Sequence, residues 1–134
     1  MSIRAVLFDL DNTLTHRGRS VAAFSQSLVD YYQSQLNCVD VEQIESIVNR
    51  IDNGGYPLKK YLTHPGIGAS VAYALLQELN WQVSPHLEEL SNFWFEQFGC
   101  SAVAMPEAEQ TLTRLKQAGY KLAIISNGGH ATRL

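Results

Sequence analysis

The chain of 134 residues has few cysteines, no long apolar run and no excess of positive charge. Its two cysteines, Cys38 and Cys100, belong to no CxxC pair and to no Cys/His group with metal-ligand spacing. We therefore expect reduced, packed thiols in a cytoplasmic protein. No apolar run approaches the ~20 residues of a membrane-spanning helix. Residues 1–4 lead directly into an apolar segment, so we expect no signal peptide.

The charge balance also excludes some partners. Ten Lys and Arg against 13 Asp and Glu give a formal net charge of −3. This balance offers no general attraction to nucleic acid or to an anionic membrane, so we expect neither as a partner. The sequence shows no internal repeat and no low-complexity linker, and its length is enough to bury a reasonable core.

The most informative stretch begins near the N-terminus. Residues 5–8 are apolar at every position, which predicts a strand buried on both faces, as in a parallel sheet. Asp9 and Asp11 follow directly, then Asn12 and Thr13. Chemistry in open α/β sheets collects at the carboxyl ends of strands. Two acids beside an apolar strand cost free energy unless a cation neutralises them, and Mg²⁺ prefers oxygen ligands. The alternative is a turn with solvated acidic side chains.

The pattern Asp9-x-Asp11-x-Thr13 after an apolar strand resembles the first motif of the haloacid dehalogenase (HAD) superfamily of phosphohydrolases. The resemblance implies that Asp9 is a nucleophile that forms an aspartyl-phosphate. It implies that Asp11 is the general acid and then the general base, and that Asp9 and Asp11 bind Mg²⁺, Asp11 through its backbone carbonyl. Thr13 would support the loop within the phosphate-binding set. An acid at position 11 favours phosphoester chemistry over dehalogenation, because relatives that break carbon–halogen bonds lack it.

Helical periodicity dominates the middle of the chain. Ser20 is the expected N-cap of a first helix that Asn37 ends. Asp40 and Gln43 resemble a capping box that opens a second helix. Ser84 and Pro85 are the expected start of a fourth. The predicted helices cover residues 21–36, 41–51, 69–79 and 85–98, and we expect them to form a compact bundle.

A second site motif follows near the C-terminus. A helix is predicted from about Pro106 to Gly119, and residues 121–125 repeat the pattern of a buried strand. The hydroxyl of Ser126 and the N–H groups of Asn127 and Gly128 are suited to bind a phosphoryl group. By themselves these residues also fit an ordinary turn. They resemble the second motif of the HAD superfamily, in which Ser126 would be the phosphate-binding hydroxyl.

Together these patterns predict an α/β fold. A strand, a helical insertion, one helix and a second strand form a β–α–β unit, whose connection is expected to be right-handed. The resemblance implies a partial Rossmann-like HAD core, residues 1–16 and 101–134, and an inserted α-helical cap bundle, residues 17–100. It implies Mg²⁺ as cofactor and a small phosphorylated metabolite as substrate.

Two motifs of the superfamily do not occur in this sequence. The third is a lysine and the fourth an acidic pair, and residues 127–134 contain no Lys, Asp or Glu. We therefore expect a Mg²⁺-dependent phosphomonoester hydrolase that is impaired or inactive as this chain, since one missing electrostatic group costs ~100–1,000-fold in rate. A truncated product, a complement from another polypeptide and a swapped oligomer each explain the gap, and we expect the first.

The alternative is a non-catalytic interaction or regulatory protein that retains the front half of the fold. In the superfamily the first strand is central, so here it would present a bare apolar edge. Such an edge favours pairing with a second copy or strand exchange. Three further residues, His16, Arg17 and Arg19, line the cleft between core and cap in one interpretation and form a solvated basic loop in the other.

Overall fold

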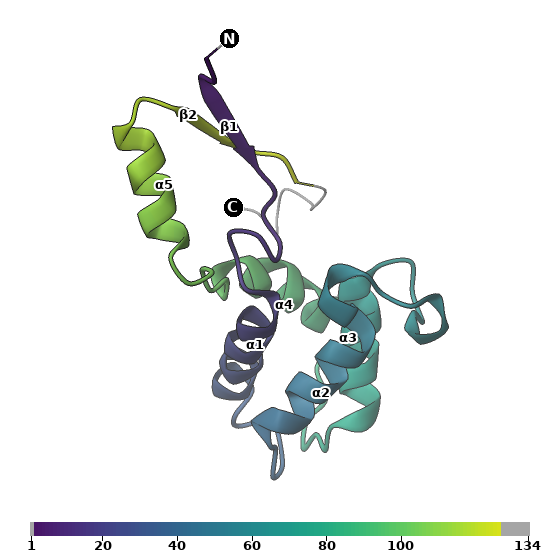
Figure 1. Ribbon diagram of the computed structural model, residues 1–134. Helices are drawn as coiled ribbons and strands as arrows, with labels where there is room; N and C mark the ends of the chain where they lie inside the picture. The colour runs from purple at the N-terminus through teal and green to yellow at the C-terminus, as the bar shows by residue number, and fades with distance from the viewer. Residues whose placement is uncertain (1, 127–134) are drawn as a thin grey trace.

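The computed structural model describes residues 2–126 and has a small sheet joined to a cluster of helices (Figure 1). The α/β fold class is therefore confirmed. Two one-turn 3₁₀ helices, Asn53–Gly55 and Lys59–Tyr61, are labelled η1 and η2. In chain order the elements are β1 (Ala5–Phe8), α1 (Arg17–Tyr31), α2 (Val41–Asp52), η1 (Asn53–Gly55), η2 (Lys59–Tyr61), α3 (Ile67–Glu78), α4 (Leu87–Cys100), α5 (Ala108–Gln117) and β2 (Lys121–Ile124).

The sheet consists of two parallel strands, as the β–α–β pattern predicts. Ala5 pairs with Lys121 and Phe8 with Ile124, and α5 packs beside β2 (Figure 1). The N–H group of Ile125 donates to the carbonyl of Phe8 at 2.8 Å, one residue beyond β2. This register brings the carboxyl ends of both strands to the same end of the sheet, where the two sequence motifs begin.

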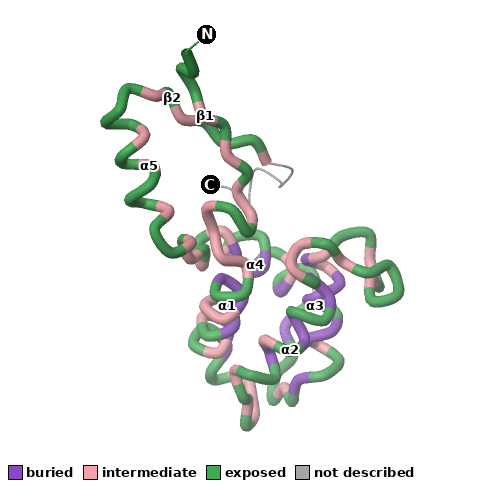
Figure 2. The backbone as a smooth tube through the Cα atoms, viewed as in Figure 1, coloured by how far each residue is buried: buried purple, intermediate pink, exposed green. Residues whose placement is uncertain are grey.

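The buried core lies in the helices. All the buried hydrophobic residues described fall between Val21 and Phe98, and Figure 2 shows them concentrated on α1–α4. Phe24 meets Trp94 edge-on with ring centroids 5.0 Å apart, and Trp94 stacks on Phe98 at 4.4 Å. No helix among residues 2–126 has both the length and the apolar character needed to cross a membrane.

The strands are much more exposed than their sequences indicate. Leu7 is 59% exposed and Ile124 55%, and α5 contributes no buried residue. The prediction of strands buried on both faces is therefore wrong for the part of the chain described. An apolar run indicates that a strand is suited to burial, but burial also requires other elements that pack on both faces of the sheet. The expectation of packed thiols is also wrong, since Cys38 and Cys100 are exposed.

Helix boundaries differ from the predictions where tertiary contacts engage the side chains that were expected to cap the helices. α1 begins at Arg17, and its N-cap is His16, whose Nδ1 accepts a hydrogen bond from the N–H of Arg19 at 3.0 Å. Ser20, predicted as the N-cap, is instead buried within the helix. Its Oγ donates to the carbonyl of His16 at 2.8 Å and accepts from the N–H of Val103 at 2.9 Å. Ser20 therefore ties α1 to the segment that leads into α5.

Other helix ends show the same competition. α1 ends at Tyr31, before the predicted Asn37, and α4 begins after His86 rather than at Pro85. Asp40 is confirmed as an N-cap, accepting from the N–H of Glu42 at 3.1 Å. The capping box is only half formed, because the side-chain amide of Gln43 donates to the carbonyl of Glu78 at 3.4 Å instead.

Candidate active site

The loop after β1 is a tight turn built around one carbonyl group. The carbonyl of Leu10 accepts from the N–H groups of Thr13, Leu14 and Thr15 at 3.0–3.2 Å and from Oγ1 of Thr15 at 3.2 Å. Asn12 adopts a left-handed conformation with φ of 59°, which Asn tolerates better than most residues. The loop therefore holds the two acidic residues on either side of Leu10 in fixed backbone positions.

Asp9 stands exposed directly after β1, at the carboxyl end of the strand, where ligands bind in open α/β sheets. Thr13 Oγ1 donates a hydrogen bond to Asp9 Oδ2 at 3.3 Å. This contact gives Thr13 a supporting role toward the Asp9 side chain. A direct role for Thr13 in binding phosphate stays a prediction.

Ser126 lies at the same end of the sheet as Asp9. Phe8 pairs with Ile124, so the residues that follow the two strands emerge side by side, and Ser126 is half-buried there. Asn127 and Gly128, the other predicted phosphate-binding residues, lie outside the described residues. That the Ser126 hydroxyl and the Asp9 carboxylate serve one site stays a prediction, supported by this register.

Asp11 faces the helices and forms an ion pair with Arg17. Arg17 Nη1 lies 3.4 Å from Asp11 Oδ1. The same guanidinium forms a two-pronged contact with Asp52 at the end of α2, Nε to Oδ2 at 3.0 Å and Nη2 to Oδ1 at 2.5 Å. The N–H of Gly55 donates to Asp52 Oδ2 at 3.2 Å. One arginine therefore bridges an acid of the β1 loop and an acid of the helical cluster.

This arginine is largely removed from solvent. The Arg17 side chain is 13% exposed and that of Asp52 fully buried, and the guanidinium lies over the ring of Phe98 at 4.6 Å. Burial lowers the pKa of Arg17, but hydrogen bonds and charge from Asp52, and then from Asp11, outweigh it and raise the pKa above its usual value. Arg17 is thus a permanently charged group beside Asp11, whereas Arg19 is exposed to solvent.

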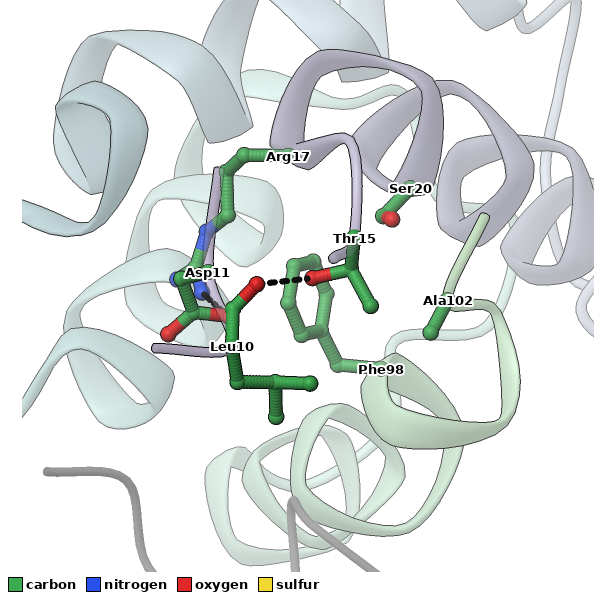
Figure 3. A pocket seen from close by; sticks show the side chains of 7 residues that line it. All are labelled: Leu10, Asp11, Thr15, Arg17, Ser20, Phe98 and Ala102. Atoms are coloured by element: carbon green, nitrogen blue, oxygen red, sulfur yellow. Dashed lines mark hydrogen bonds and ion pairs between the residues drawn. The ribbon is translucent and has the colours of Figure 1, made fainter. Parts of the chain in front are cut away.

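A small pocket of about 50 Å³ lies behind the loop (Figure 3). Figure 3 shows the guanidinium of Arg17 beside the carboxylate of Asp11 at one side of it. This volume admits a few water molecules but is far below the ~300–1,000 Å³ of a typical ligand site. The pocket, which Asp11 lines, is therefore too small to hold a substrate. Its lining residues are Leu10, Asp11, Thr15, Arg17, Ser20, Phe98 and Ala102.

The acidic loop offers the donor chemistry of a Mg²⁺ site. Within residues 2–126 no three His, Cys, Asp or Glu side chains gather as a metal cluster. Mg²⁺, however, keeps several waters and is commonly held by only one or two carboxylates. Asp9 and Asp11 supply hard oxygen atoms at the end of β1. The residues present therefore fit a Mg²⁺ ion whose shell is completed by other groups.

Sequence reasoning missed Asp52. The run around it reads as a break between helices, yet Asp52 is the last residue of α2 and is 0% exposed. A signal was present: Asp52 lies four residues after Val48 and eight after Ile44, on the buried face of the helix. An acid that continues an apolar stripe requires a buried cationic partner.

A family model and one solved structure agree with this architecture. The family model described as haloacid dehalogenase-like hydrolase matches residues 3–133. A solved dehalogenase structure is similar at 23% identity and a TM-score of 0.56, covering 98% of this chain and 54% of that one. A predicted phosphoglycolate phosphatase from Haemophilus somnus 129pt matches at 18% identity and a TM-score of 0.44, with coverages of 96% and 53%.

The chain spans about half the length of these two structures. The likeness to the dehalogenase supports the fold alone. No curated protein matches the chain.

Proposed function

Because the chain belongs to the haloacid dehalogenase-like hydrolases, we propose that its acidic loop serves Mg²⁺-dependent hydrolysis of a phosphomonoester through an aspartyl-phosphate. One observation carries this proposal: the β1 loop holds two acids, an exposed Asp9 at the strand end and Asp11 two residues on. Dehalogenation requires no acid at the second position. The presence of Asp11 therefore favours transfer of a phosphoryl group to Asp9.

The two acids have separate roles in the proposed reaction. A carboxylate oxygen of Asp9 forms a bond to phosphorus while the bond to the leaving oxygen breaks, and Asp11 gives that oxygen its proton. Water then attacks phosphorus, passes a proton to Asp11 and releases the Asp9 carboxylate. The hydrogen bond from Thr13 at 3.3 Å orients Asp9 for both steps. Ser126, with the N–H groups of Asn127 and Gly128, binds the phosphoryl oxygens in this proposal.

In the same proposal the Asp9 carboxylate and the backbone carbonyl of Asp11 hold Mg²⁺, as the resemblance to the superfamily implies. The ion pair between Arg17 and the Asp11 side chain is compatible with this arrangement. A bound Mg²⁺ supplies positive charge that offsets the charge of the phosphoryl group.

In this proposal full activity requires two further motifs of the superfamily. A lysine and an acidic pair complete the proposed chemistry, and residues 127–134 contain none of these residue types. We propose that the groups come from residues outside this chain, in the same polypeptide or another. The substrate in this proposal is a small phosphorylated metabolite in the cytoplasm, and the 134-residue chain alone turns over little or none of it.

Beryllofluoride, which mimics a phosphoryl group on a carboxylate, tests the proposed nucleophile. We expect ¹⁹F NMR of the purified chain with millimolar beryllofluoride and Mg²⁺ to show bound fluoride resonances, and the melting temperature to rise. Asp9→Asn should abolish both effects. Asp30→Asn, which changes an exposed acid on α1, should retain them. No bound resonance in the wild-type chain, or the same resonance in Asp9→Asn, would overturn the proposal.

Hydrolysis of p-nitrophenyl phosphate tests the second part of the proposal. We expect the 134-residue chain to release little or no p-nitrophenol with Mg²⁺. Rapid Mg²⁺-dependent release that Asp9→Asn abolishes would show that the chain needs no further groups.

A second function is favoured by the exposed apolar side chains of the sheet. Leu7 and Ile125 are 59% and 62% exposed, which is unusual for strand and strand-end residues of an α/β protein. In this alternative the chain is a non-catalytic interaction or regulatory protein. The beryllofluoride experiment separates the two functions, since an interaction protein has no need of a reactive Asp9.

A further inference from the structure

We propose that Arg17 and Asp52 form a positioning pair that holds the side chain of Asp11 in one orientation. The inference deepens the proposed function, on which the catalytic meaning of Asp11 rests. Arg17 contacts both Asp11 in the β1 loop and Asp52 at the end of α2.

The guanidinium of Arg17 is held in one plane by Asp52. Asp52 engages Nε and Nη2 of Arg17 at 3.0 and 2.5 Å, which fixes the plane of the guanidinium because both prongs are occupied. The remaining nitrogen, Nη1, is then directed at Asp11 and lies 3.4 Å from its Oδ1. Lysine has no such fork, so this geometry is specific to arginine.

Neighbouring residues also pack around the guanidinium of Arg17. The guanidinium lies over the ring of Phe98 at 4.6 Å. Gly55 lies beside it, since a Cβ at that position would lie 3.6 Å from Arg17 Cζ, an ordinary van der Waals distance. Gly55 also has a φ of +90°, which favours glycine. The arginine is therefore held by its hydrogen bonds and by contacts around the guanidinium.

Asn12, the neighbour of Asp11, makes a second connection to the helices. Asn12 accepts a hydrogen bond from the backbone N–H of Arg17 at 3.2 Å, and its side-chain amide donates to the carbonyl of Gly54 at 3.4 Å. Two consecutive loop residues, 11 and 12, are thus linked to residues 52–55. Two links restrain both the position and the rotation of the loop.

Because Asp52 is fully buried, its carboxylate and the Arg17 guanidinium each require the other as a partner. A fully buried carboxylate without its arginine leaves an uncompensated charge. Arg17 is therefore committed to Asp52, and Asp11 receives the one nitrogen that remains. Asp11 is positioned through Arg17, and Arg17 is positioned through Asp52.

NMR of the side-chain rotamers measures this positioning without any need for turnover. In the ¹³C,¹⁵N-labelled chain, three-bond couplings should show Asp11 in a single χ1 rotamer of the three staggered ones. In Arg17→Gln the couplings should average over more than one rotamer. Asp52→Asn should produce the same averaging although Arg17 is still present, because the fork is lost.

Arg50→Gln is the matched control. Arg50 makes a two-pronged contact with Glu78, but both side chains are more than one-third exposed. This variant should leave the Asp11 couplings unchanged. If Arg17→Gln does not fold, Arg17→Lys keeps the positive charge and should still allow Asp11 to average.

A single Asp11 rotamer in a folded Arg17 variant, or averaging already in the wild-type chain, would overturn the proposal. Failure of the proposed function is a separate result, namely a wild-type chain that binds no beryllofluoride. If a form of the protein that includes the two further motifs hydrolyses p-nitrophenyl phosphate, Arg17→Lys should lower its kcat about 10²-fold and leave KM unchanged. A loss of this size is typical of a misplaced catalytic group.

Discussion

Asp52 is a fully buried acidic residue of the helical cluster. It is 0% exposed, and its two oxygens accept from Arg17 and from the N–H of Gly55. A buried ion pair contributes little net stability over an apolar replacement, but removing one partner is costly. The stability of the molecule should therefore respond very differently to the loss of this carboxylate and to the loss of an exposed one.

Asp52→Ala should lower the free energy of unfolding by about 3–5 kcal/mol, because Arg17 remains charged and buried. The control is Glu78→Ala, which removes the acid of an exposed arginine pair and should cost about 0–1 kcal/mol. Urea unfolding followed by circular dichroism gives both values. Equal losses for the two variants would contradict the importance of burial at Asp52.

The sequence predicts the acidic residues of the site but not the pairing of Arg17 with Asp52. Asp9 and Asp11 are recognisable because their spacing and the preceding strand are local features. The pairing of Arg17 with Asp52 joins residues 35 positions apart, and it depends on how α2 packs against α1. No local pattern defines that packing, so Arg17 remained open between a cleft residue and a solvated one.

At one glycine, Gly68, α3 approaches α4 closely. A Cβ at Gly68 would lie 2.7 Å from Trp94 Cδ1 and 3.0 Å from Phe95 Cζ. Phe95 is 41% exposed and has room to turn, but Trp94 is 4% exposed and stacked on Phe98 at 4.4 Å. Trp94 therefore decides the outcome, because it is held on several sides.

Gly68→Ala should destabilise the protein despite the better helix propensity of alanine. Overpacking costs about 1–3 kcal/mol, and the propensity gain returns at most ~1 kcal/mol. The loss should appear as a lower urea midpoint and a changed Trp fluorescence. Gly66→Ser is the control, because a Cβ there meets nothing within 4 Å and serine is a good N-cap. A neutral Gly68→Ala would mean that α3 and α4 separate easily.

The helices were predictable as elements because their apolar stripes are long, whereas several of their ends, such as the start of α1, were not. Ser20 has the chemistry of an N-cap, yet it lies inside α1, where its hydroxyl serves the N–H of Val103. His16 takes the capping position instead. The decisive partner is 83 residues away in sequence, so no local reading of residues 16–20 distinguishes the two.

Burial is distributed unevenly between the helices and the sheet. The helical cluster contains the buried core, whereas β1, β2 and α5 contain no residue in the buried class (Figure 2). The strand pattern correctly indicated two apolar strands but overestimated their burial, because nothing in residues 2–126 covers the face on which Leu7 lies exposed. Apolar strands with unpaired edges are templates for further pairing.

We therefore expect the 134-residue chain to associate with itself through the sheet. The mass from size-exclusion chromatography with light scattering should rise with protein concentration, and Leu7→Lys should reduce that rise because a charged residue on a strand edge opposes pairing. Tyr56→Lys changes a residue that is 79% exposed and outside the sheet, so it should have no effect. A monomer of full helical content at every concentration would show that the exposed strands form no interface between copies, and would contradict the form of the interaction function in which the strand edge pairs with a second copy.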